Sequence, residues 1–184
     1  MDMRSREGIQ RQGYNGGYVA VVYRPASLIS NMEPSMNDLL SWNNTVFCGL
    51  AFYSIILIIQ MFILAVYTGI TRIKKQAFAN PEDAASVGVE VKHNDPDVER
   101  VHRVHLNNLE NIPAFILSGL FYTASNPNVM IALMLFRIFF VFRILHTVAQ
   151  LFLHVRMFRS ICFFAALFIN VFMLIMALMA FHQF

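Results

Sequence analysis

Charged and amide side chains recur along ERVHRVHLNNLENIPAF, residues 99–115, which leads into an apolar segment. Arg100, Arg103, Asn107 and Glu110 are spaced three, four and three residues apart. This spacing places all of them on one face of an α-helix. We therefore expect a polar helix face that carries mostly cations, with a single carboxylate at its far end.

A second polar stripe lies in the segment 129–155, where Arg143, His146 and Gln150 are spaced three and four residues apart and Thr147 is adjacent. Ionisable groups at membrane depth are costly. They are tolerated where they face a bundle interior or a wet cavity, in which they pair with one another. Two such stripes on two helices predict one polar cavity between the helices.

The charge of this cavity favours one kind of ligand. Arginine side chains bind carboxylates through two parallel hydrogen bonds, Glu110 suits an ammonium group, and Asn107 suits an amide. This mixture fits a small zwitterion with more carboxylates than amines. An equally open alternative is structural, namely that Arg103 and Glu110 neutralise each other and join helices.

The histidines near the first stripe do not predict a metal site. Glu99 and His102 have the Glu-x-x-His spacing of a di-metal helix, and Glu90 and His93 repeat it. The second pair lies in a polar loop, and such sites also need a Glu from each of two further helices. The other apolar segments contain no Glu, so we expect no metal.

The elements that must position these residues are predicted to be membrane-spanning helices. The chain has 184 residues, of which 57% are hydrophobic and 14% charged, whereas soluble domains carry about 25% charged residues. A spanning helix needs about 20 mostly apolar residues. Residues 42–70 and 160–181 fit cleanly, and about 100–125 and 129–155 fit with polar interruptions. The predicted fold is all-α, an integral membrane four-helix bundle.

The connections predict the domain organisation and the orientation. Residues 1–38 lack a long apolar run and are expected to be a flexible tail, which leaves 39–184 as one domain. Residues 81–97 are expected to form a polar surface loop. Lys and Arg flank the connections between the first and second and between the third and fourth segments, which predicts that both connections are cytosolic.

Charge and cysteine content exclude other classes of protein. The net charge is +3 and the basic residues are scattered among apolar segments, which excludes a nucleic-acid-binding surface. Cys48 and Cys162 lie inside apolar runs without metal-binding spacing, so we expect buried thiols rather than a disulfide scaffold.

The sequence resembles the MAPEG family, the membrane-associated proteins of eicosanoid and glutathione metabolism. The resemblance is carried by FANPEDA at 78–84, DPDVERVHRVHLNNLENI at 95–112, RILHT at 143–147 and the pair Arg159-Ser160. It covers the chain from about residue 39 to its end. The glutathione S-transferase branch looks most similar, and the prostaglandin E synthase branch next.

The resemblance implies a homotrimer in the endoplasmic reticulum membrane, with the mitochondrial outer membrane as a second location. Glutathione would bind between neighbouring subunits near the cytosolic face, at Arg72, Arg103, Asn107, Glu110, Arg143, His146 and Gln150. Arg159 would stabilise its thiolate, and Ser160 would donate a hydrogen bond to it. The implied second substrate is an apolar electrophile, a lipid hydroperoxide or a prostaglandin endoperoxide.

Several residues depart from the family pattern. Gln150 and Phe163 stand where tyrosines are expected, and Asn108 stands where an aspartate is expected. Leu106 matches the transferase branch, whereas Ser160 matches the synthase branch. These departures favour a glutathione transferase or peroxidase over a prostaglandin E synthase.

Two further classes of function remain as alternatives. A non-catalytic lipid-binding scaffold of the same family would have no need of the arginine, asparagine and glutamate set, although the missing tyrosines keep this alternative open. A channel or transporter would need ionisable residues along a whole path. The first segment has none, and the last has none between its first turn and His182.

Overall fold

The computed structural model describes residues 9–14, 17–22, 39–153 and 155–182. The chain divides into two compact units, Met1–Asp38 and Leu39–Phe184, and each is described by itself below.

The first unit contains an antiparallel pair of strands, β1 (Ile9–Tyr14) and β2 (Gly17–Val22). Ile9 pairs with Val22, and Tyr14 pairs with Gly17 across a short connection. β2 is rich in valine, which favours extended backbone. The sequence analysis expected no strand here, so the all-α class applies to the second unit only.

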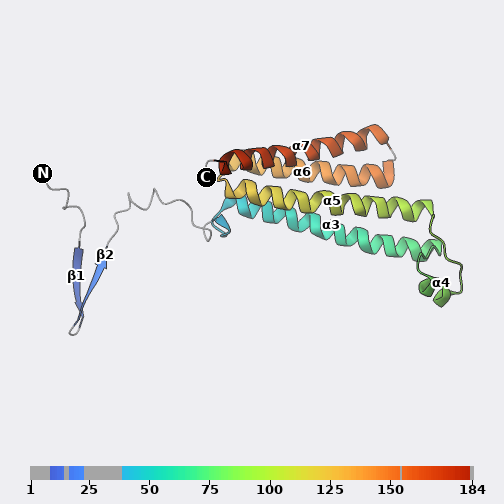
Figure 1. Ribbon diagram of the computed structural model, residues 1–184, viewed down its shortest axis with the longest axis horizontal. Coiled ribbons are helices and arrows are strands. Elements are labelled where there is room, and N and C mark those ends of the chain that lie inside the picture. Colours follow the sequence, from blue (N-terminus) through green and yellow to red (C-terminus); the bar gives the residue numbers. More distant parts are fainter. Residues whose placement is uncertain (1–8, 15–16, 23–38, 154, 183–184) are drawn as a thin grey trace. The chain divides into compact units, whose positions relative to one another are not determined.

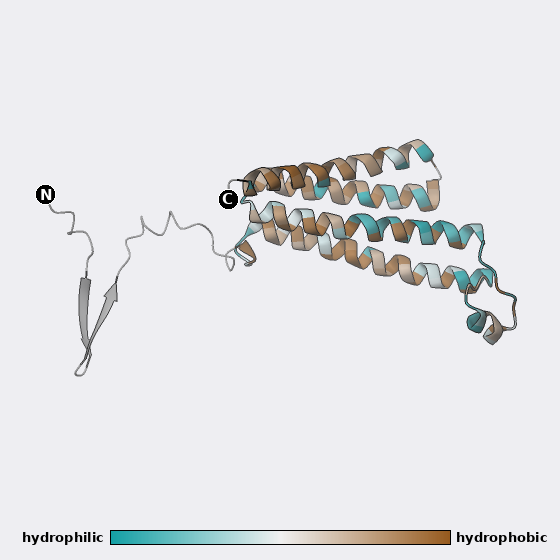
Figure 2. Cartoon of the chain, viewed as in Figure 1, coloured by the Kyte–Doolittle hydropathy of each residue, from teal (hydrophilic) through white to brown (hydrophobic). Residues whose placement is uncertain are grey.

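The second unit is all-helical in its described residues. Its helices are α3 (Thr45–Lys75), α4 (Pro81–Val87), α5 (Pro96–Ala124), α6 (Val129–Val148), the π-helical turn η1 (Ala149–Leu153) and α7 (Arg156–Phe181). The long helices α3, α5, α6 and α7 run side by side (Figure 1). α3 packs on α5 and α6, and α7 packs on α6 and α5. Figure 2 shows that polar residues gather toward the beginning of α5, while the beginning of α6 and the end of α7 are apolar.

Side-chain caps explain where the long helices begin. Asn44, Asp95 and Asn128 precede α3, α5 and α6, and the side-chain oxygen of each accepts hydrogen bonds from the backbone N–H groups of the first turn. α3 continues past the predicted end at residue 70 as far as Lys75. It stops at Gln76, which adopts the left-handed conformation (φ 47°).

The predicted polar loop at 81–97 is wrong in part, because it contains α4 and the start of α5. Pro81 occupies the first turn of α4, where its missing N–H costs nothing. Glu82 and Asp83 follow in the same turn, where negative charge complements the helix dipole. Gly88 ends the helix with φ 71°, a conformation that suits glycine.

Within the described part of the chain, three helical stretches are long and apolar enough to cross a membrane: Thr45–Lys75, Val129–Leu153 and Arg156–Phe181. α5 is as long as these but is polar in its first half. The structure therefore supports a membrane protein with three such helices, and a fourth span along α5 stays a prediction.

An aromatic cluster forms the centre of the apolar core. Phe115 of α5 stacks on Phe139 of α6 with ring centroids 4.0 Å apart, and it meets the edge of Phe136 at 5.9 Å. Gly119 lets α3 approach α5 closely, because a Cβ atom there would collide with the side chain of Leu50. This packing fixes the α5 positions from which the polar residues project.

Candidate functional site

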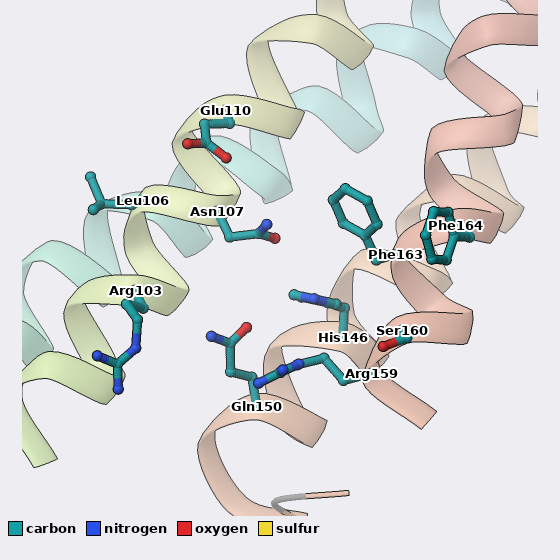
Figure 3. Close-up of a pocket in the computed structure, with 10 residues that line it drawn as sticks. All are labelled: Arg103, Leu106, Asn107, Glu110, His146, Gln150, Arg159, Ser160, Phe163 and Phe164. Atoms are coloured by element: carbon teal, nitrogen blue, oxygen red, sulfur yellow. The ribbon is translucent and has the colours of Figure 1, made fainter. Parts of the chain in front are cut away.

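A pocket of about 610 Å³ lies between α5, the α6–η1 segment and α7. Figure 3 shows side chains from α5 on one side and from α6, η1 and α7 on the other. The lining residues are Arg103, Leu106, Asn107, Glu110, His146, Gln150, Arg159, Ser160, Phe163 and Phe164. Most of the residues that the sequence analysis selected are therefore brought together in one place.

The α5 wall consists of Arg103, Leu106, Asn107 and Glu110, which recur at helical spacing. Arg100, the first member of the predicted face, does not line the pocket and lies 3.4 Å from Asp97 instead. The predicted helix face is present in α5, but the pocket lining begins at Arg103, one turn after Arg100.

The ion pairs argue against mutual neutralisation of Arg103 and Glu110. Arg103 lies 3.8 Å from Glu99, one turn earlier on the same helix. No ion pair found among the described residues includes Glu110, whose side chain lines the pocket. The Glu110 carboxylate is therefore available for a cationic group of a ligand.

Arg143 does not line the pocket but lies beneath its α5 wall, fully buried. One terminal nitrogen, Nη2, donates to the backbone carbonyl of Asn107 (3.3 Å), to the Asn107 side-chain oxygen (3.0 Å) and to the side-chain oxygen of Asn108. Arg143 thereby links α6 to α5 and orients Asn107, which does line the pocket. Its part in the site is to position Asn107.

Asn108 extends this network across the helices. It is fully buried, and its amide nitrogen donates to the Thr147 hydroxyl at 3.0 Å. Gln60 of α3 donates to the same hydroxyl at 2.8 Å. The asparagine that stands where an aspartate was expected therefore joins α5 to α6, and the Thr147 hydroxyl extends this link to α3; Asn108 does not line the pocket.

No carboxylate among the described residues forms a direct ion pair with the guanidinium of Arg143. Its Nε and Nη1 atoms are buried without a hydrogen-bond partner in the part of the chain that the structure describes, and no ion pair there includes it. A buried charge without a partner is costly. Its positive charge lies next to Asn107 and therefore adds to the positive field of the pocket.

The α6 and η1 wall supplies His146 and Gln150. The imidazole ring of His146 is almost fully buried and lies 6.2 Å from the ring of Phe163. Gln150 falls in the π-helical turn Ala149–Leu153, which interrupts the end of α6. Such turns are frequent at functional sites, and this one carries Gln150 to the pocket.

The α7 wall supplies a cation, a hydroxyl and an apolar surface. Arg159 and Ser160 lie in the first turns of α7, and Phe163 and Phe164 follow at helical spacing. In the structure the Ser160 hydroxyl donates to the backbone carbonyl of Arg156 at 3.1 Å. The predicted donation from Ser160 to a ligand therefore needs a rotation of this hydroxyl.

Arg72 lies away from this pocket. It is near the end of α3, and its guanidinium donates to the backbone carbonyl of Ala77 at 3.4 Å. In contrast, the apolar residues Leu106 and Phe164 line the pocket although they were not selected as site residues. Their positions three residues after Arg103 and four after Ser160 were the signal that would have identified them.

These residues can hold an anionic, partly apolar ligand. Arg103, Arg159 and the underlying Arg143 provide positive charge, and Glu110 provides the negative charge of the lining. Among the residues that the structure describes, no group of His, Cys, Asp and Glu side chains is arranged to hold a metal ion.

Comparison with known proteins gives matches over most of the helical unit. The sequence profile described as the MAPEG family matches residues 50–179. Prostaglandin E synthase from Bos taurus is 44% identical over 121 residues, which are 65% of this chain and 78% of that protein. Prostaglandin E synthase from Homo sapiens is 46% identical over 99 residues, or 53% of this chain and 65% of that protein.

A protein named for the other activity matches to a similar degree. Microsomal glutathione S-transferase 1 from Sus scrofa is 41% identical over 113 residues, which are 59% of this chain and 73% of that protein. Both branches named in the sequence analysis are thus represented, and the resemblance to the family is confirmed. The identities do not favour the transferase over the synthase, so the choice between them depends on the site residues.

Proposed function

Because the chain belongs to the MAPEG family, we propose that it is a membrane-bound enzyme that binds glutathione in this pocket and uses its thiolate as a nucleophile. The single observation that carries the proposal is the convergence of Arg103, Asn107, Glu110 and Arg159 on one pocket. Glutathione has two carboxylates, one ammonium group, amides and a thiol. Each of these groups finds a chemical complement in that lining.

The roles follow from the chemistry of each side chain. Arg103 binds a glutathione carboxylate, because a guanidinium offers two parallel donors. Glu110 binds the ammonium group, since no direct ion pair among the described residues includes its carboxylate. Asn107 is oriented by Arg143 and bonds to an amide of the tripeptide.

Arg159 is the residue that activates the thiol. A free thiol has a pKa of about 8.5, and the thiolate is the reactive form. A guanidinium beside the sulfur stabilises the anion, lowers the pKa of the thiol and raises the reactive fraction at neutral pH. The thiol proton leaves to solvent before the attack.

We propose a transferase as the activity. The thiolate attacks an electrophilic carbon, so that the sulfur–carbon bond forms as the bond to a leaving group such as halide breaks. Leu106 supplies apolar surface from the α5 wall, and Phe163 and Phe164 supply it from the α7 side, where Phe164 is 64% exposed. An apolar electrophile dissolved in the membrane therefore has a route to the thiolate along this side.

The same thiolate supports a peroxidase activity. Attack on a lipid hydroperoxide breaks the oxygen–oxygen bond, releases the lipid alcohol and oxidises the sulfur. A second glutathione then forms the disulfide and releases water. This activity uses the same lining and differs only in the apolar substrate.

A prostaglandin E synthase is the second candidate. In that reaction the thiolate attacks an endoperoxide and is released again, so glutathione serves as a cofactor. The pair Arg159-Ser160 and the similarity to proteins named prostaglandin E synthase favour it. Phe163 disfavours it, because a phenyl ring at this point of the pocket has no hydroxyl to donate.

Assembly as a homotrimer in the endoplasmic reticulum membrane, with α5 as a fourth span, completes the proposal. The position of Arg72 supports a shared site, since its guanidinium lies off the pocket of its own chain. In a trimer this side chain is able to serve the pocket of a neighbouring copy. Cross-linking in detergent and in native membranes measures the number of copies.

The test is a parallel assay of the purified protein. Glutathione binding is measured by calorimetry, and then conjugation to an aryl halide, reduction of a lipid hydroperoxide and isomerisation of an endoperoxide are compared. Conjugation faster than isomerisation is expected. Faster isomerisation would replace the transferase by the synthase, binding without any turnover would favour a lipid-binding scaffold, and absence of glutathione binding would overturn the proposal.

A further inference from the structure

An exposed arginine lies on the outer surface of a helix that is able to cross a membrane. Arg137 belongs to α6, inside the stretch Val129–Leu153. Met130, Met134 and Val141 lie at helical spacing on either side of it and are 69%, 51% and 49% exposed. Arg137 is therefore a cation within an outward apolar stripe, where an ionisable group is costly unless something pairs with it.

The Arg137 guanidinium is hydrogen-bonded to a tyrosine of the neighbouring helix. The Nε atom of Arg137 donates to the hydroxyl of Tyr53 on α3 at 3.2 Å. The Tyr53 ring is fixed between Phe52 and Phe140, with ring centroids 5.2 and 5.4 Å away. This contact uses Nε, and no hydrogen bond of the two terminal nitrogens, which form a fork, is found among the described residues.

No carboxylate among the described residues forms an ion pair with this guanidinium. The ion pairs among the described residues use Asp95, Asp97 and Glu99, and none includes Arg137. The sequences of α3, α6 and α7 contain no Asp or Glu at all. A second copy of the chain therefore offers no carboxylate from those helices either.

Glu110, the acid of the pocket, lies at a different level. Arg137 is nine residues from the cap of α6, or about 14 Å at 1.5 Å per residue, whereas Glu110 is fourteen residues from the end of α5, or about 21 Å. Those two helix ends are joined by the turn at 125–128. Arg137 thus lies at a different height along the bundle from Glu110, and the two do not form an ion pair.

We propose that Arg137 and Tyr53 form a binding site for the carboxylate of a long-chain fatty acid. A carboxylate matches the two terminal nitrogens of a guanidinium, and an acyl chain matches the apolar stripe that continues to Val141. The level of Arg137 selects this ligand over a phospholipid. A hydrocarbon core is about 30 Å thick, so a residue about 14 Å from the helix end lies well inside it, below the phosphate groups.

The site goes beyond the proposed function and does not depend on it. It takes an anionic amphiphile from the membrane at the outer surface of α3 and α6, and neither Arg137 nor Tyr53 lines the glutathione pocket. Loss of one site is expected to leave the other intact.

The test measures binding of labelled oleate to the full chain in detergent micelles, with methyl oleate and phosphatidic acid as competitors. Arg137→Leu is expected to weaken oleate binding about tenfold, the effect of losing one charge-assisted bidentate contact. Tyr53→Phe is expected to weaken it less, because the guanidinium remains. Arg156→Leu is the matched control, since it removes an exposed arginine from the first turn of α7, and it is expected to bind oleate normally.

Several results would overturn the site. They are unchanged oleate binding by Arg137→Leu, competition by methyl oleate equal to that by oleate, or displacement of oleate by an equal concentration of phosphatidic acid. A change of oligomeric state in Arg137→Leu, with oleate binding retained, would assign the cation to contact with a second copy. If Arg137→Leu fails to fold, Arg137→Lys decides the matter, because it keeps the charge but loses the fork and should bind oleate only weakly.

Discussion

The two ends of the helical unit are held together in different ways. Around the pocket, side chains of different helices are joined by hydrogen bonds, as between Arg143 and Asn107 and between Asn108 and Thr147. Toward the other end, the helices meet mainly through apolar packing, as between Phe115 and Phe139, and single hydrogen bonds such as those from Arg137 to Tyr53 and from Ser118 to Asn170 add to it. α5 takes part in both regions, with a polar first half and an apolar second half.

The hydrogen bonds position side chains of the pocket, whereas the apolar contacts pack the helices against one another. Lipid chains are as apolar as leucine, so apolar contacts between membrane helices depend on close fit, while polar bonds across helices specify geometry. Directional bonds around Asn107 hold it within the pocket wall, whereas the stacked rings hold the helices at a fixed separation. Substitutions around the pocket are therefore expected to change glutathione binding or turnover, and substitutions among the stacked rings are expected to change stability.

Arg159→Ala is expected to reduce turnover by about 100- to 1,000-fold, the usual cost of removing one donor that stabilises a developing or existing anion. Glutathione affinity should change little, because Arg159 is assigned to the sulfur and not to the carboxylates. Steady-state kinetics and calorimetry measure the two effects. An equal loss of binding would show that Arg159 holds the tripeptide.

Phe115→Ala is expected to lower the free energy of unfolding by about 3 kcal/mol, because it leaves a cavity among stacked rings. The affinity for glutathione of the protein that remains folded should be unchanged. Thermal unfolding in detergent and glutathione titration measure this pair. If glutathione affinity fell by more, in free energy, than the stability to unfolding, the apolar end would also position the pocket, and the two ends would not differ in role.

Asn108→Leu tests the polar end without touching the pocket lining. It removes one acceptor from the buried guanidinium of Arg143, a change worth about 2 kcal/mol when a buried charged donor loses its partner. Asn107 loses part of its support, so glutathione affinity should fall as well as stability. Thr147→Val is the companion variant, since it removes the Asn108 and Gln60 bonds but leaves Arg143 bonded to both asparagines. If Asn108→Leu changes stability alone, the network does not position the site.

Asp95 caps α5 and lies outside both regions. Asp95→Asn is therefore expected to have the smallest effect on stability. A hydrogen bond from Lys92 holds the pKa of the Asp95 carboxyl below its usual range. The stabilisation is therefore present above the usual carboxyl pKa and is lost as the pH falls through the lowered value. Asparagine is also able to cap α5, so the variant should be only slightly less stable to thermal unfolding than the parent at neutral pH. This difference in stability should vanish in acid. Thermal melts across this pH range measure it, and a difference that grows in acid would contradict the assignment.

The sequence predicted that a polar cavity exists, but it did not predict the place of every residue around it. Helical spacing correctly grouped Arg103, Asn107 and Glu110, because side chains three or four residues apart share a face whatever the surroundings. Spacing does not report depth, so it could not show that Arg143 lies beneath the wall or that Arg72 lies off the pocket of its own chain.

The elements were predictable where apolar runs are long and were missed where they are short. The apolar content marked α3 and α7 cleanly and α6 with polar interruptions, and all of these helices are apolar enough to cross a membrane. α4 was missed because seven residues are too few to show a periodic pattern, although Pro81 and Gly88 are helix start and stop signals. The role of Asn108 was also hidden, since its partners Arg143 and Thr147 lie more than thirty residues away in sequence.

The most direct test of the account is the ionisation of glutathione bound in the pocket. Thiolate absorbance is followed as the pH is raised, with saturating glutathione, for the parent protein and for Arg159→Ala. We predict that the bound thiol ionises at least about one pH unit below the free thiol, and that this difference disappears in Arg159→Ala while binding persists. A bound thiol that ionises like free glutathione in the parent protein would contradict the central claim.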